Sequence, residues 1–235
     1  MEPSKAKPNP LAISIAIVIA GALIGGAVIL GSRQPGNSVA ANAQQPQAAA
    51  ADISKVKIVG EPFIGKQDAP VTIAYWYDYQ CPFCKQNEET AMPQLIKEYV
   101  DTGKVKVVFK DYQFLSEDSQ TLGKYSRAVW ETAPDTFYSW HKAVYDNQGT
   151  ENTGWATKAK IESITKGVLS ADMTAKVVAL VKANGAEYQN EMDADKVEGT
   201  DFGVSGTPGF IIGKQRIDGA VPYAQIKAAI EAALK

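Results

Sequence analysis

Two cysteines, Cys81 and Cys84, enclose the dipeptide Pro-Phe, and they are the only cysteines in this chain of 235 residues. A structural zinc site usually needs a second such pair or two histidines, and His141 is the single histidine. Haem attachment would need a histidine after the second cysteine, where Lys85 stands. A permanent disulfide closing so short a loop would remove little chain entropy. The pair is therefore predicted to cycle between dithiol and disulfide, and no metal and no cofactor are expected.

The segments on either side of this motif predict a strand followed by a helix. Residues 71–77 (VTIAYWY) are β-branched and aromatic, as is typical of a buried strand. A helix is expected from Cys84 to about Asp101, and Pro82 suits its first turn, where a missing N–H costs nothing. Cys81 then lies at a helix N-terminus, which stabilises a thiolate and should lower the pKa of Cys81 below the free value of about 8.5. Cys84, one turn further in, is expected to be more buried and to act as the resolving thiol.

The N-terminal part of the chain predicts a membrane anchor and a linker. Two lysines precede an uncharged apolar run, and at 1.5 Å per residue this run matches a hydrocarbon core of about 30 Å. The positive-inside rule places residues 1–10 in the cytoplasm, a transmembrane anchor at 11–31, and the rest of the chain outside the cytoplasmic membrane, facing the periplasm or cell exterior. Residues 32–52 have the Gly-, Gln- and Pro-rich composition of a flexible linker. A cleaved signal peptide is the alternative, because residues 41–43 (ANA) have the form of a cleavage site.

The charge balance limits the partners. The chain carries 24 Lys and Arg against 26 Asp and Glu, a net charge of −2, without a strongly basic stretch. This argues against nucleic acid as a partner. No obvious dimerisation segment follows the linker, so a monomer is expected.

Residues 53–235 predict one α/β domain. Strands are expected at 56–59, 71–77 and 104–112, and a hairpin turning near Gly213 precedes a last helix opened by Pro222. Between them, about 115–199, the pattern is helical throughout. The expected helices cover 116–131, 136–147, 157–169, 171–183 and 185–197. A sheet interrupted by an all-helical insertion, with Cys-x-x-Cys at the head of its first helix, predicts a thioredoxin fold.

Three motifs carry a resemblance to the DsbA family of exported thiol:disulfide oxidoreductases, over about residues 60–234. They are residues 78–84 (DYQCPFC), 137–148 (FYSWHKAVYDNQ) and 203–210 (GVSGTPGF). The resemblance implies that Pro208 is a cis proline facing the cysteines. It also implies that the backbone of Thr207 pairs with an extended substrate as an added strand.

The chain departs from the family pattern near the cysteines. Family members often carry an acidic residue in the strand below the active site, where this chain has Tyr75. Without that acid, the usual proton route to the resolving cysteine is in doubt, and Lys110 lacks its expected partner if it points inward; an exposed Lys110 is an equal alternative. Phe83 stands where the strongest oxidants carry His, so a milder oxidant is expected. His141 is interpreted as an ordinary helix residue, and Trp76 with Phe83 as a candidate apolar groove near the sulfurs.

The resemblance implies an enzyme that introduces disulfide bonds into exported proteins with free thiols, followed by reoxidation through a membrane quinone-linked partner. A disulfide isomerase or reductase is the alternative within the same chemistry. Outside it, Cys81 and Cys84 could serve a non-catalytic metal-binding or chaperone-like module, although nearby Met or His ligands for a soft metal are lacking.

Overall fold

The structure is a computed structural model that describes residues 51–235. The predicted cytoplasmic segment 1–10, the anchor 11–31 and nearly all of the linker 32–52 lie outside the described residues. Among the helices that are described, none is long and apolar enough to cross a membrane.

A five-stranded sheet forms the centre of the domain, in the order β1-β3-β2-β4-β5. The strands are β1 (Phe63–Ile64), β2 (Val71–Tyr77), β3 (Val105–Asp111), β4 (Gly209–Ile212) and β5 (Gln215–Asp218). β2 and β3 run parallel, as expected for strands joined through a helix, and the other neighbouring pairs are antiparallel. The predicted hairpin at Gly213 is confirmed by β4 and β5.

The prediction of a strand at residues 56–59 is wrong. A short 3-10 turn, η1 (Ile53–Lys55), precedes this segment, and the first strand is β1. Val56 is buried, but the Val59 side chain is 84% exposed, and Gly60 turns the chain at a φ of +89°. Val56 and Ile58 therefore pack against the smaller core on one face of the sheet, but this segment does not form a strand.

The helix after the cysteines begins two residues earlier than expected. α2 (Pro82–Leu95) has Cys81 as its N-cap and Pro82 in its first turn. Pro93 lies inside α2, and the wider π-helical turns of η2 (Ile96–Val100) follow it. Proline lacks the N–H that a regular helix needs, so a local change of helical geometry close to it is expected.

The insertion is helical throughout, as predicted. It contains α3 (Glu117–Thr132), η3 (Pro134–Thr136), α4 (Phe137–Asp146), α5 (Lys158–Val168) and α6 (Ala171–Asp201). The two last predicted helices are in fact one, because α6 runs without a break through Gly185. Burial of Val177, Tyr188 and Met192 along its length offsets the cost of about 1 kcal/mol for a helical glycine.

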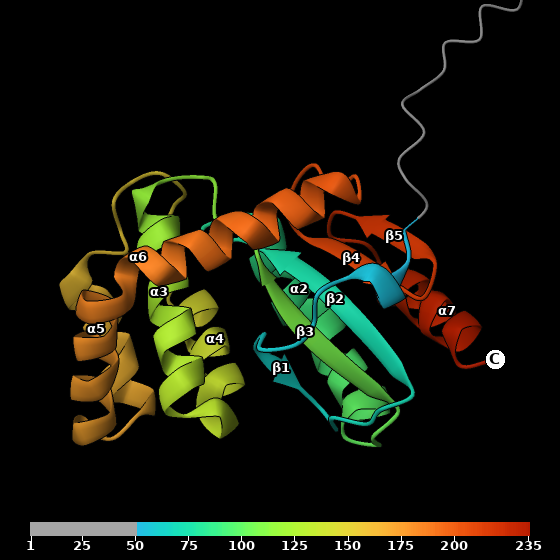
Figure 1. Cartoon of the computed structure of the whole chain (residues 1–235), viewed down its shortest axis with the longest axis horizontal. Coiled ribbons are helices and arrows are strands. Elements are labelled where there is room, and N and C mark those ends of the chain that lie inside the picture. The colour runs from blue at the N-terminus through green and yellow to red at the C-terminus, as the bar shows by residue number, and fades with distance from the viewer. Residues whose placement is uncertain (1–50) are drawn as a thin grey trace, which may run out of the picture. The chain divides into compact units, whose positions relative to one another are not determined.

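The two faces of the sheet carry different layers (Figure 1). Tyr75, Tyr77 and Phe109 point into the larger core, which α2, α4 and the last helix α7 (Tyr223–Ala233) cover. Alternate residues, among them Trp76, point to the opposite face, where the C-terminal half of α6 lies. This half of α6 brings the insertion back onto the sheet shortly before β4.

Candidate active site

The loop between β2 and α2 is held by a buried aspartate. The Asp78 carboxylate accepts hydrogen bonds from the backbone N–H groups of Gln80 (2.8 Å), Phe114 (2.9 Å) and Leu115 (3.1 Å), and from the Ser119 hydroxyl (2.7 Å). Burial raises its pKa, while these hydrogen bonds act to lower it. The Asp78 carbonyl in turn accepts from the N–H of Cys81 at 3.1 Å. Asp78 thus fixes the position from which Cys81 enters α2.

Helix α4 and the residues after it secure the same loop from the insertion. The Tyr145 hydroxyl donates to the Asp78 carbonyl at 3.0 Å. The Gln148 side-chain amide donates to the carbonyls of Tyr79 (2.8 Å) and Cys81 (3.1 Å). The sequence motifs contained these residues, but their contacts cross from the insertion to the active-site loop and leave no local signal in the sequence.

Cys81 has the environment of a thiolate. Its pKa is lowered to about 6, chiefly by a hydrogen bond from the Cys84 side chain, against a raising effect of burial, and further by the Thr207 side chain and the N–H groups at the start of α2. The Cys81 side chain is 5% exposed, and that of Cys84 is fully buried. Both cysteines are unpaired thiols here, so the structure represents the reduced form.

Cys84 has the opposite electrostatics. Burial raises the pKa of its thiol well above the ordinary value, and the hydrogen bond it gives to Cys81 and the charge of that neighbour act in the same direction. The pair is therefore asymmetric: near neutral pH one sulfur is a stabilised anion and the other a protonated donor.

The loop of Thr207 and Pro208 reaches Cys81, in agreement with what the family resemblance implies. The Thr207–Pro208 peptide bond is cis. The Cys81 thiol donates to the Thr207 carbonyl at 3.2 Å. The buried Thr207 hydroxyl has no hydrogen-bond partner among the described residues in this form, and it can donate to Cys81 when that sulfur is ionised.

Tyr75 lies where the sequence places it, below Cys84. Its side chain is fully buried, stacked on Phe210 with ring centroids 4.8 Å apart, and its hydroxyl lies next to Cys84 and Asn87. Burial raises the pKa of this phenol well above 10, so Tyr75 stays neutral.

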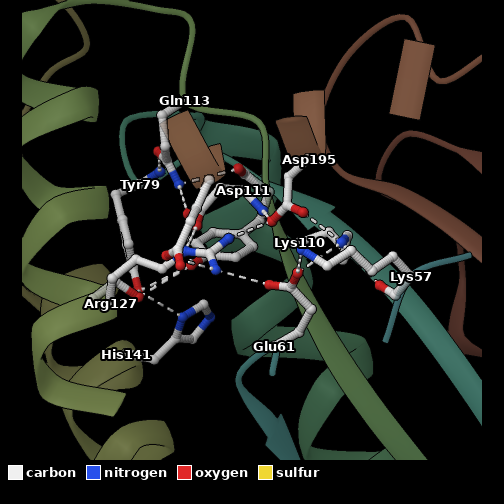
Figure 2. Close-up of polar contacts among 12 residues, drawn as sticks. Lys57, Glu61, Tyr79, Lys110, Asp111, Gln113, Arg127, His141 and Asp195 are labelled. Carbon is white, nitrogen blue, oxygen red and sulfur yellow. Dashed lines mark hydrogen bonds and ion pairs between the residues drawn. The ribbon is translucent and has the colours of Figure 1, made fainter. Parts of the chain in front are cut away.

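Lys110 points inward, but away from the cysteines. It follows Phe109 on β3, so strand alternation turns it to the face opposite Cys84. There it is fully buried, pairs with Asp195, Glu61 (3.2 Å) and Glu198 (3.1 Å), and donates to the Lys57 carbonyl at 3.0 Å (Figure 2). Burial acts to lower its pKa, but Asp195 and Glu61 outweigh that effect and raise it. Its partners are thus supplied by other elements than β2.

The apolar groove expected from Trp76 and Phe83 does not form. Trp76 is buried on the same face as Lys110, where its indole N–H donates to the Asp195 carbonyl of α6 at 2.9 Å. Phe83 remains beside the sulfurs and is 59% exposed. The two side chains therefore lie on different sides of β2.

His141 is a hydrogen-bonded core residue, as interpreted from the sequence, but its partner Glu88 was missed. Both are almost completely buried, and His141 Nε2 lies 3.3 Å from Glu88 Oε1. Glu88 follows Cys84 by four residues, and the sequence alone indicates one of two adjacent acidic residues on a helix surface. In the fold, α4 covers Glu88.

A thioredoxin-type sheet with an asymmetric dithiol at the head of α2, facing a cis proline, defines the class: a thiol:disulfide oxidoreductase. The family model described as Thioredoxin matches residues 57–232. Disulfide bond formation protein D from Bacillus subtilis (strain 168) is 30% identical over 178 residues, which cover 76% of this chain and 79% of the relative.

Solved structures agree with this. Oxidised BdbD from Bacillus subtilis is similar with a TM-score of 0.71 and 27% identity, over 79% of this chain and 98% of that chain. The thiol-disulfide exchange protein α-DsbA2 from Wolbachia pipientis shares the fold, with a TM-score of 0.64 at 23% identity over 74% of this chain and 87% of that chain. The present chain belongs to the thioredoxin family, and it is a DsbA-like thiol:disulfide oxidoreductase.

Proposed function

We propose that this protein introduces disulfide bonds into exported proteins, with Cys81 as the sulfur that exchanges with substrate and Cys84 as the resolving thiol. The observation that carries the proposal is the asymmetry of the pair: the pKa of Cys81 is lowered to about 6, whereas that of buried Cys84 is raised. A sulfur with a low pKa is the better leaving group, and the more accessible sulfur is the one attacked.

The reaction proceeds through a mixed disulfide. A substrate thiolate attacks the Cys81 sulfur of the oxidised enzyme, the Cys81–Cys84 bond breaks, and Cys84 leaves with the electron pair. A second substrate thiolate then attacks the substrate sulfur bound to Cys81 and releases the Cys81 thiolate. The substrate loses two electrons, and the enzyme ends as the dithiol seen in this structure.

Thr207 positions the substrate in this proposal. Its carbonyl lies 3.2 Å from the Cys81 sulfur, so an extended substrate chain that pairs with the backbone at Thr207 and Pro208 brings its own cysteine to Cys81. Pro82 sets the first turn of α2, and the exposed ring of Phe83 adds an apolar contact beside the sulfur.

The cellular setting follows from the sequence. The apolar run at residues 11–31 supports a single membrane anchor with the catalytic domain outside the cytoplasm, where disulfides persist. Reoxidation by a membrane quinone-linked partner fits that location, and the protein acts as a monomer.

The test is catalysed oxidation of a reduced two-cysteine peptide by the full-length protein, with glutathione disulfide as the final oxidant. Turnover is expected for the wild type, none for Cys81→Ser, and for Cys84→Ser a trapped mixed disulfide detected by mass spectrometry. A Cys84→Ser protein that traps nothing, together with a Cys81→Ser protein that does, would reverse the roles of the two cysteines.

A further inference from the structure

Release of Cys84 requires a proton at a place that solvent does not reach. The Cys84 side chain is fully buried and its raised pKa means that the leaving sulfur ends as a thiol. Tyr75 lies next to this sulfur, but burial raises the pKa of its phenol well above 10, so it is a poor proton donor by itself. Another buried group has to supply the proton.

Glu88 and His141 form such a group, one turn of α2 below Cys84. Residues four apart on a helix share a face, so the Glu88 carboxyl lies on the side of α2 that carries Cys84. It is 1% exposed and His141 is fully buried. The Tyr138 hydroxyl donates to Glu88 Oε2 at 2.9 Å, and Oε1 lies 3.3 Å from His141 Nε2.

A chain of hydrogen bonds reaches His141 Nδ1 through Tyr79 (Figure 2), and each of its links is satisfied when Nδ1 carries a proton. It starts at Asp111, whose carboxylate is paired with the Arg127 guanidinium at 2.7 Å and therefore accepts from the Tyr77 hydroxyl at 3.2 Å. The Tyr77 oxygen can then accept from the Ser126 hydroxyl (3.2 Å), which itself accepts from Tyr79 (2.9 Å).

With its only hydrogen donated to Ser126, the Tyr79 oxygen is left as an acceptor for His141 Nδ1, which lies 3.0 Å away, and this assigns a proton to Nδ1. With Nδ1 protonated, the contact between Nε2 and Glu88 needs a hydrogen of its own. Either the carboxylic acid donates to a neutral imidazole, or an imidazolium donates to a carboxylate. In both cases the pair holds one transferable proton and is neutral overall.

Buried polar side chains of β2 and α2 that have no hydrogen-bond partner within the described part of the chain lie near Cys84. The Tyr75 hydroxyl and both polar atoms of the Asn87 side chain are buried and have no hydrogen-bond partner among the described residues. The Tyr75 hydroxyl lies next to both Cys84 and Asn87, and the charge of Glu88 acts to raise the pKa of the Tyr75 phenol. The ionisable side chains around the pair are otherwise neutral phenols, whose pKa values burial raises: Tyr75, Tyr77, Tyr79, Tyr138 and Tyr145.

We propose that the Glu88–His141 pair stores the proton that Cys84 takes up on leaving, by way of Tyr75 and Asn87. As the substrate thiolate forms its bond to Cys81, the Cys84 thiolate takes the stored proton and the pair acquires one negative charge. When Cys84 is reoxidised, its proton returns to the pair. Glu88 and His141 are thus positioning residues, and they fill the role left open by Tyr75 in β2.

The first test is the rate at which a small thiol reduces the oxidised full-length protein in a single turnover, measured between pH 5 and 8. Glu88→Gln keeps a hydrogen-bond acceptor for Tyr138 but cannot ionise, and it is expected to slow this step by about 10-fold or more and to flatten its pH profile, because general acid catalysis contributes about 10²–10⁴-fold. The matched control is Glu89→Gln, an exposed acid at the next position of α2, which should leave rate and profile unchanged. His141→Gln should behave as Glu88→Gln does. Wild-type rate and pH profile in a folded Glu88→Gln protein would overturn the proposal.

The second test needs no substitution, because His141 is the only histidine of the chain. In the oxidised full-length protein labelled with ¹⁵N-histidine, the Nδ1 signal is expected at the position of a protonated nitrogen at neutral pH. An unprotonated Nδ1 with a protonated Nε2 would mean a carboxylate facing a neutral imidazole, with no proton to give, and would refute the proposal. This inference rests on the proposed Cys81/Cys84 cycle; absent wild-type turnover contradicts the cycle, whereas these two tests address only the pair.

Discussion

At the scale of single residues, the site depends on the different surroundings of two sulfur atoms that lie within one helical turn. Cys81 is the N-cap of α2 and receives hydrogen bonds from Cys84, Thr207 and the backbone, whereas Cys84 is fully buried in the core that also holds Tyr75 and Tyr145. Hydrogen bonding to an anion lowers a pKa and burial raises it. One structural motif therefore stabilises both the thiolate and the thiol of the reduced pair.

The first prediction concerns the titration of Cys81. In the reduced protein the thiolate absorbance near 240 nm should rise with a midpoint at about pH 6. A pKa lowered on folding contributes stability that is present above the unfolded value of about 8.5 and is lost as the pH falls through the folded value. The free energy of unfolding of the reduced form, relative to the oxidised form, should therefore be higher at pH 8 than at pH 5. A midpoint at or above about 8.5 would contradict the assignment.

The place of Cys81 and Cys84 at the start of α2 was predictable from a local motif at a strand-to-helix junction, and the cis bond before Pro208 from the family resemblance of residues 203–210. The sequence was not sufficient for Glu88, whose role depends on burial by α4, a helix far away in the chain. The surroundings of Lys110 could not be predicted either. Strand alternation predicts on which face of the sheet Lys110 lies, but only the packing of α6 shows that this face is buried.

At the scale of elements, α6 does most to join the insertion to the sheet. Asp195 on this helix contacts Lys110 and Arg127, accepts from the N–H of Asp111 at 3.0 Å, and offers its carbonyl to Trp76. Its continuity through Gly185 was missed because a glycine surrounded by polar residues reads as a helix end. Tertiary packing decided otherwise, as it often does against local propensity.

Lys110 provides the second prediction. Lys110→Met removes one partner of a buried ion cluster and leaves the charges of Glu61 and Asp195 less compensated, which should lower the free energy of unfolding by about 3–5 kcal/mol. Lys106→Met is the control on the same strand: Lys106 is also buried, but its amino group contacts a backbone carbonyl, that of Gln67, at 3.1 Å. The free energy of unfolding of Lys106→Met should be lower than that of the wild type by about 1–2 kcal/mol. Equal losses in urea denaturation would show that the carboxylates do not depend on Lys110.

Two glycines of α6 provide the third prediction. A Cβ at Gly199 would lie 2.7 Å from the indole nitrogen of Trp76, whereas one at Gly185 would meet nothing within 4 Å. Gly199→Ala is expected to destabilise the protein by about 1–3 kcal/mol through overpacking. Gly185→Ala should stabilise it by up to about 1 kcal/mol through helix propensity. Thermal unfolding of the two variants compares the same substitution in one helix, and a gain at both positions would mean that α6 does not press on Trp76.

At the scale of the whole molecule, the electrostatics favour the reduced state and hence the oxidation of substrates. The fold class, the helical insertion and the hairpin were predictable, because hydrophobic periodicity and turn residues are local properties. The edge of the sheet was not, because β1 has two residues and its pairing with β3 depends on how the preceding loop packs.

The fourth prediction is the reduction potential. Equilibration of the full-length protein with glutathione should give a value between about −120 mV, as for DsbA, and about −230 mV. Phe83→His should raise it by tens of millivolts, since about 30 mV corresponds to 1.4 kcal/mol for two electrons. Phe83→Leu adds no charge or donor and should stay near the wild type. A wild-type value near −270 mV, typical of thioredoxin, would point to a reductase.

The contact of α6 with the sheet restricts which substitutions the insertion can accept independently of the sheet. Asp195 and Gly199 of the insertion contact Trp76 of the sheet. The insertion therefore cannot be replaced by that of another protein without changes in the sheet. A graft of α3 to α6 from a relative would have to bring matching residues into β2 and β3 as well. Substitutions at the meeting point of insertion and sheet are therefore expected to be inherited together, although the chain positions involved are more than a hundred residues apart.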